Sequence, residues 1–161
     1  MDGSKYSQNV SAFKCRDSLI LVSNVKTGQG LWYLHQPIVI LDAHLPVSQI
    51  GSALLRTLAA TQTGFAEPPT QTELETTVKK LVQAASVHSF EEFMQHTQHC
   101  VVGRYEAGIE IVPTHKGDLQ DETEGLQFLL TKSILVEAEA LPGKLGQALL
   151  QGFAAGTAAD E

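Results

Sequence analysis

The chain has 161 residues, of which 43% are hydrophobic and 18% are charged, so it suits one globular domain and excludes a disordered protein. Its 18 acidic and 11 basic side chains give a net charge of −7, which argues against a nucleic-acid backbone as direct ligand and favours a basic partner. The features of a secretory signal are absent, as is a run of about 18 apolar residues for a membrane span. We therefore expect a single cytoplasmic domain over residues 1–161.

The first part of the chain, residues 13 to 61, is predicted to form strand, loop, strand and helix. Strands are expected at SLILVSN (18–24) and PIVIL (37–41), because both runs are short and rich in β-branched residues. Apolar residues at helical spacing follow, so a helix with one buried face comes next. Its predicted buried face consists of Ile50, Ala53, Leu54, Thr57 and Leu58.

A glycine-rich segment, KTGQG (26–30), lies between these two strands and lacks the lysine and hydroxyl residue that complete a phosphate-binding loop. We interpret it as a hairpin turn. Trp32 and Tyr33 follow it as neighbours on a strand, so they face opposite sides of a sheet. One of them is expected in the core and the other on the surface, an arrangement that also occurs at protein interfaces.

A helical insert is predicted over residues 70 to 99. Thr70 and Glu73 have the spacing of a capping box, and Ser89 and Glu92 give a second helix start. The insert carries apolar faces that must cover part of the sheet. We therefore assign it a structural role.

The last part of the chain, residues 101 to 156, repeats the order of the first. Strands are expected at GIEIVPT (108–114), LQFLL (126–130) and SILVEA (133–138), followed by a second amphipathic helix. An offset of 95 positions superposes seven identical residues of the two helical regions. The pairs are Ala43 and Ala138, Gly51 and Gly146, Ala53 and Ala148, Leu54 and Leu149, Leu55 and Leu150, Ala59 and Ala154, and Ala60 and Ala155.

These observations predict an α+β fold, in which duplicated strand-loop-strand-helix units form antiparallel sheet packed with helices around a central helical insert. Gly51 and Gly146 each cost about 1 kcal/mol of helix propensity relative to alanine. Their matching positions indicate a close approach, either of helix to sheet or of one helix to the other. We favour packing over ligand binding, because no phosphate-binding pattern lies beside either glycine.

Few residues suggest metal or nucleophilic chemistry. His96, His99 and Cys100 would share one face of a helical turn, but no fourth ligand or known zinc spacing accompanies them. We expect no metal and no cofactor. Cys15 and Cys100 are expected to be free thiols, as is usual in a reducing compartment.

The segment KGDLQDETEG (116–125) is the most acidic in the sequence. Charges at this density are not buried without partners. The segment is therefore either a solvated loop or a docking surface for a cationic protein. Its acidic residues are Asp118, Asp121, Glu122 and Glu124.

Three segments resemble the immunity proteins of bacterial contact-dependent growth inhibition systems, the CdiI family. They are PIVILDAHLPVSQIGSALLRTL (37–58), GIEIVPTHKGD (108–118) and SILVEAEALPGKLGQALLQGF (133–153). The resemblance implies a cytoplasmic protein without enzymatic activity that binds and neutralises the C-terminal toxin domain of a delivered effector. Such toxins are often nucleases, and an acidic inhibitor would complement their basic substrate cleft. On this reading, the toxin contacts are Asp118, Asp121, Glu122 and Glu124.

Two alternatives remain open at the level of the sequence. One is a small-ligand or metal-dependent enzyme domain that uses a cleft between the repeat halves, with His96, His99 and Cys100. The other is a nucleic-acid-binding protein in which Trp32, Tyr33 and Tyr105 stack on bases. The net charge disfavours the second alternative.

Overall fold

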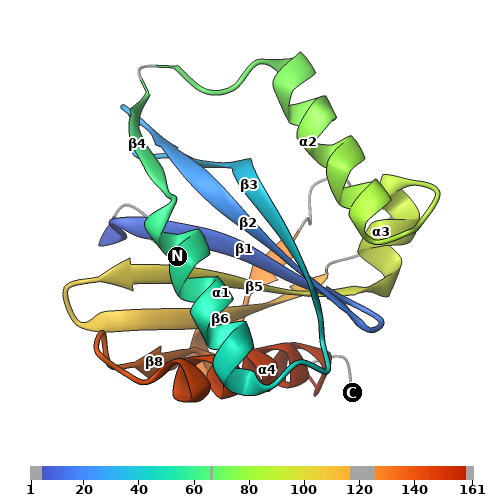
Figure 1. The fold of residues 1–161 in the computed structure, drawn as a ribbon. Coiled ribbons are helices and arrows are strands. Elements are labelled where there is room, and N and C mark those ends of the chain that lie inside the picture. The colour runs from blue at the N-terminus through green and yellow to red at the C-terminus, as the bar shows by residue number, and fades with distance from the viewer. Residues whose placement is uncertain (1–4, 66, 117–125, 159–161) are drawn as a thin grey trace.

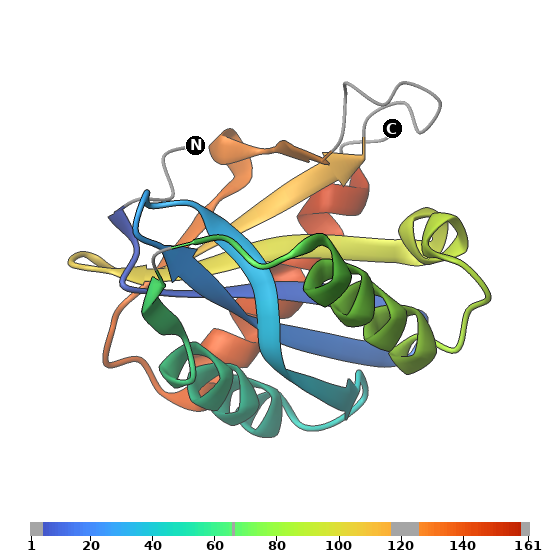
Figure 2. The ribbon, with the colours of Figure 1, turned by 90° about the horizontal axis from the view of Figure 1, so that it is seen from above.

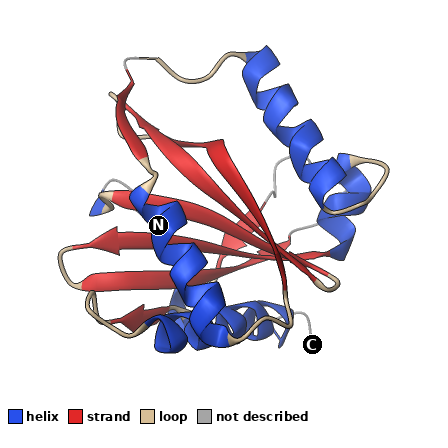
Figure 3. Ribbon diagram, viewed as in Figure 1, coloured by secondary structure: helices blue, strands red, loops and turns tan. Residues whose placement is uncertain are grey.

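The computed structural model describes residues 5–65, 67–116 and 126–158, and within them it confirms the predicted α+β architecture (Figures 1 and 3). None of the helices in these ranges is long and apolar enough to cross a membrane. The strands are β1 (Gln8–Cys15), β2 (Ser18–Thr27), β3 (Trp32–Asp42), β4 (Gln62–Phe65), β5 (Thr97–Tyr105), β6 (Gly108–Lys116), β7 (Leu126–Phe128) and β8 (Ile134–Val136). The helices are α1 (Val47–Ala59), α2 (Gln71–Ala84), α3 (Phe90–His96), the short 3-10 helix η2 (Leu130–Lys132) and α4 (Pro142–Ala158).

The strands form one eight-stranded sheet in the order β3-β2-β1-β5-β6-β7, with β4 beside β2 and β8 beside β6. All described pairings are antiparallel except that of β2 with β4. The predicted hairpin turn at 26 to 30 joins β2 to β3, and the Gly30 N–H donates to the Thr27 carbonyl at 3.0 Å. The centre of the sheet is β1, which pairs with β2 on one side and β5 on the other.

Strand β1 was not predicted from the sequence, because polar residues interrupt its apolar pattern. Asn9 and Ser11 lie inside the sheet with Asn24 of β2, and all three are buried. The Asn24 side-chain amide donates to the Asn9 side-chain oxygen, and also to the Ser11 hydroxyl at 3.0 Å. Buried polar groups are tolerated when they bond to one another in this way.

Helices α1 and α4 cover one face of the sheet, and both of their predicted apolar stripes are buried there. Helices α2 and α3 cover the opposite face over the first strands, where the rings of Phe13 and Phe93 meet at a centroid distance of 5.2 Å. Figure 2 shows α1 and α2 on opposite sides of β3. The main core contains Val10, Ala12, Leu19, Leu21, Ile50, Ala53, Leu54, Leu58, Cys100, Val102, Ile109, Ile111, Val136, Leu145, Ala148, Leu149 and Phe153.

Both helix starts expected in the insert are present. The Thr70 hydroxyl accepts a hydrogen bond from the Glu73 N–H at 3.2 Å, and the Glu73 carboxylate accepts one from the Thr70 N–H. Ser89 caps the start of α3. The insert is shorter than predicted, because α3 ends at His96 and residues 97 to 99 begin β5. Pairing with β1 and β6 overrides the local helical pattern there. The strand expected at 126 to 130 is likewise reduced to β7, with η2 after it.

The two matched glycines lie where α1 and α4 cross. A Cβ atom on Gly51 would overlap the carbonyl oxygen of Pro142, and one on Gly146 would overlap the carbonyl oxygen of Val47. The Gly146 Cβ would also lie 3.0 Å from the Gly51 nitrogen. The sequence left open whether these glycines allow a helix to approach the sheet or the other helix. In the structure they allow the two helices to approach each other.

We predict that Gly51→Ala or Gly146→Ala separates the two helices and lowers the free energy of unfolding by about 1–3 kcal/mol, as overpacking of a tight contact does. Gly143→Ala is the matched control, because its Cβ would lie 3.8 Å from the Val47 side chain, at ordinary contact distance. Urea denaturation of the three variants measures the difference. Equal stabilities for all three would contradict the packing role of the pair.

Candidate interaction edge

Strand β3 forms one edge of the sheet, and its outer side pairs with no other described strand (Figure 1). Its 11 residues are all half-buried or exposed, whereas almost every residue of the adjacent β2 is buried. Ile40 is 56% exposed in spite of its apolar side chain. A long edge strand with free backbone groups and exposed apolar side chains is a template for pairing with another chain.

Surface hollows lie beside β3 on both faces of the sheet. On the α1 face, a hollow of about 410 Å³ lies beside the end of the strand, and a smaller one of about 80 Å³ lies beside its middle. On the other face, a hollow of about 200 Å³ separates β3 from α2. A chain that docked along β3 would therefore find space for side chains on both faces of the sheet. The hollow between β3 and α2 is lined by Leu34, His35, Gln36, Pro69, Thr72, Glu73, Thr76 and Thr77.

Aromatic and charged side chains accompany the strand. Trp32 and Tyr33 are both half-buried, so neither is the core residue that the sequence analysis expected. The Lys26 ammonium lies 5.5 Å from the centroid of the Trp32 ring. Aromatic residues with a polar edge are typical of protein interfaces. Tyr105 lies on β5, which β2 and β1 separate from β3, so the three aromatic residues do not form one stacking surface.

The predicted toxin contacts Asp118, Asp121, Glu122 and Glu124 lie outside the described residues. The nearest described pairing is that of Lys116 with Leu126, between β6 and β7. This pairing belongs to the edge of the sheet opposite β3. The β3 edge and the pairing of β6 with β7 therefore lie at opposite edges of the sheet.

The histidine and cysteine cluster does not form. His96 ends α3, while His99 and Cys100 are consecutive residues of β5 whose side chains face opposite sides of the sheet. The Cys100 side chain lies in the core under α4, whereas the His99 ring packs on Phe13 at a centroid distance of 4.7 Å. In the described part of the chain, no group of three or more His, Cys, Asp or Glu residues is placed to hold a metal ion.

Burial, rather than a partner charge, sets the pKa of His99 and that of Cys100. It lowers the pKa of His99 to about 4 and raises the pKa of the Cys100 thiol to about 12. The Thr114 hydroxyl donates to the His99 carbonyl and lies 2.9 Å from Nδ1 of the His99 ring, so this ring nitrogen is the donor. Cys15 and Cys100 are both buried and neither is in a disulfide, as expected, and its raised pKa keeps the Cys100 thiol protonated at neutral pH.

The enzyme hypothesis required a cleft between the repeat halves. The two parts of the chain meet through continuous backbone pairing of β1 with β5 and through the contact of α1 with α4 at Gly51 and Gly146. Of the hollows described above, only the largest touches both parts, because Pro142 at the start of α4 lines it beside α1.

No protein-family model matches the chain, and no curated protein matches it in sequence. Solved structures share the fold, and two of them are compared with this chain. A protein of unknown function, NMB0488 from Neisseria meningitidis, is 15% identical with a TM-score of 0.76, and the match covers 92% of this chain and 94% of that one. A chain of the CdiA-CT/CdiI toxin and immunity complex from Yersinia pseudotuberculosis is 12% identical with a TM-score of 0.74, covering 91% and 95% respectively. At these identities the likeness concerns the fold alone, which is CdiI-like.

We predict that acid destabilises the protein through His99. Its folded pKa of about 4 lies below the unfolded value of 6.5, so the unfolded chain binds more protons between these pH values and stability falls as pH falls. His99→Gln should reduce the dependence in this window by up to about 1.4 kcal/mol per pH unit. Urea denaturation between pH 4.5 and pH 7.5 measures both proteins, over roughly the range in which histidine titrates. Parallel stability profiles would show that His99 is not the group responsible.

Proposed function

We propose that this protein binds the C-terminal toxin domain of a contact-dependent growth inhibition effector and neutralises it by stoichiometric occlusion, without turnover. The toxin in this proposal is a nuclease. The outer side of β3, which pairs with no other described strand, is the observation that carries the proposal. The CdiI-like fold, which extends over nine-tenths of the chain, supports the same class of function.

The β3 edge suits a protein partner better than a small molecule. Its outer side, which pairs with no other described strand, runs from Trp32 to Asp42, and the apolar residues Pro37 and Ile40 are exposed on it. Addition of a partner strand would satisfy the backbone groups, and the flanking hollows would receive alternate side chains. Affinity would then come from the backbone and selectivity from the hollows.

Charge supports a basic partner. A nuclease presents positive charge to its substrate, and the net charge of −7 attracts such a surface and speeds association. In this proposal Asp118, Asp121, Glu122 and Glu124 contribute the acidic contacts, while the β3 edge contributes the apolar ones.

The test is calorimetry with the toxin domain encoded immediately upstream of the gene for this protein. We expect tight one-to-one binding that weakens as salt rises, and loss of nuclease activity at equimolar inhibitor. A folded and active toxin domain that does not bind this protein would refute the proposal.

Neutralising the acidic segment tests whether its charges, rather than the net charge of the protein, attract the toxin. We expect replacement of Asp118, Asp121, Glu122 and Glu124 by Asn or Gln to slow association and flatten its salt dependence. The control makes the same change in charge at four exposed glutamates elsewhere. Stopped-flow measurements over a range of salt concentrations compare the two; equal effects would assign the attraction to net charge rather than to the segment. The control positions are Glu75, Glu91, Glu106 and Glu139.

The two edges of the sheet are distinguished by a matched pair of substitutions. Ile40 on β3 and Leu135 on β8 are both 56% exposed, so an aspartate at either position costs little stability. We expect Ile40→Asp to weaken toxin binding at least about tenfold, because it places a charge in a contact that excludes water. Leu135→Asp should leave the affinity within about twofold. The reverse order of effects would move the interface to the opposite edge.

A further inference from the structure

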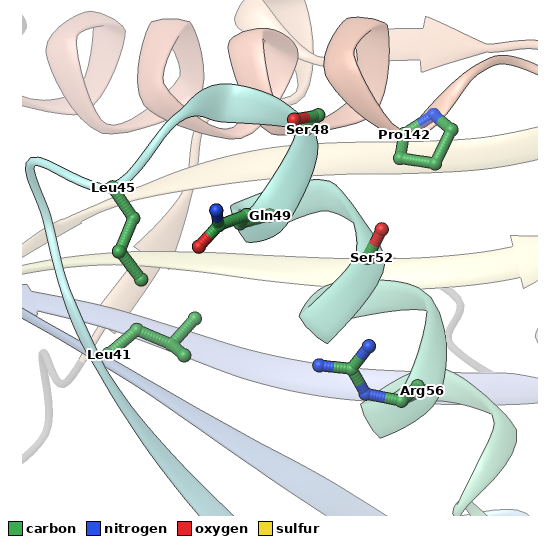
Figure 4. A pocket seen from close by; sticks show the side chains of 7 residues that line it. All are labelled: Leu41, Leu45, Ser48, Gln49, Ser52, Arg56 and Pro142. Atoms are coloured by element: carbon green, nitrogen blue, oxygen red, sulfur yellow. The ribbon is translucent and has the colours of Figure 1, made fainter.

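The largest hollow described along β3 carries a positive charge, although the protein as a whole is acidic. It lies between α1 and the end of β3, and Arg56 supplies its positive charge (Figure 4). The smaller hollow beside the middle of β3 is also lined by Arg56, so this side chain stands between the two. The residues that line the larger hollow are Leu41, Leu45, Ser48, Gln49, Ser52, Arg56 and Pro142.

The guanidinium of Arg56 is available to a partner. The side chain is exposed, and no carboxylate in the described part of the chain forms an ion pair with it. A cation in the last turn stabilises a helix through its dipole, which is the simplest structural role for Arg56. Helix α4 has Gln151 at the position 95 residues further on, however, so the repeated helix forms without a charge there.

Hydrogen-bonding groups accompany the charge. Ser48 and Ser52 precede Arg56 by two turns and one turn of α1, so the three form one polar stripe along the hollow. Leu41 and Leu45 form the opposite apolar wall. A guanidinium beside an apolar wall binds a carboxylate through paired hydrogen bonds, and the exclusion of water strengthens them.

We infer that this hollow binds an acidic side chain, aspartate or glutamate, of the protein that docks along β3, and that Arg56 thereby selects the cognate partner. The inference rests on the proposed function and names a contact within it. A nucleic-acid phosphate is a poor occupant, because the net charge of −7 repels a polyanion as a whole. A single carboxylate on a basic partner meets no such barrier.

The selection works in both directions. A general attraction between an acidic inhibitor and basic nucleases would not distinguish one toxin from another. Arg56 repels a partner that presents a lysine or arginine at this position and stabilises one that presents a carboxylate.

The test measures toxin binding by calorimetry and by dissociation rate for wild type, Arg56→Gln and Arg56→Glu. We expect Arg56→Gln to weaken binding roughly 10-fold to 100-fold, mainly through faster dissociation, and Arg56→Glu to weaken it further. Lys144→Gln is the control, because it removes an exposed cation from the neighbouring helix α4 outside the hollow. Melting temperatures of all variants should lie within about 4 °C of that of wild type, because the helix-dipole contribution of one exposed cation is small.

The acidic residues of the toxin are then neutralised one at a time in combination with Arg56→Gln. We expect one of them to be non-additive with Arg56, and its replacement by arginine to restore binding to Arg56→Glu. Equal effects of Arg56→Gln and Lys144→Gln, or strict additivity with every toxin carboxylate, would overturn the inference while leaving toxin binding intact. Failure of the wild-type protein to bind the toxin would instead refute the proposed function.

Discussion

The rest of the structure depends on the contact of two helix backbones at Gly51 and Gly146. Either glycine, if replaced by a larger residue, would drive a Cβ atom into a carbonyl oxygen of the other helix. Because the helices cross this closely, α1 and α4 fit side by side on one face of a single sheet and bury one continuous core. The identical pair of glycines in the two halves therefore reflects packing, and no ligand is required to explain it.

The same arrangement places the proposed interaction surface, strand β3, at an edge of the sheet. With β1 and β5 paired at the centre and a helix pair on one face, each half of the chain turns its last strands outwards. The helical insert then covers the second face of the first half. In the described part of the chain, the outer side of β3 with the hollows on its two faces is left open to a partner.

The centre of the sheet also contains a buried network of polar side chains. Asn9, Ser11 and Asn24 satisfy one another where β1 and β2 lie side by side, and their hydrogen bonds require one register of the two strands. A shift by one residue would separate these buried groups from their partners. This network therefore favours the register on which the edge strand depends, although its three residues are buried.

The sequence by itself determined the α+β class, the apolar stripes of α1 and α4, the hairpin turn before β3 and both helix caps of the insert, because these depend on residues close in the chain. Only the tertiary structure decided that β1 is the central strand, that His99 and Cys100 face opposite sides of β5, and that β3 is an edge. It also decided that Arg56 stands in a hollow beside β3. Strand order and the exposure of a side chain depend on which distant segments pair, and local pattern does not carry that information.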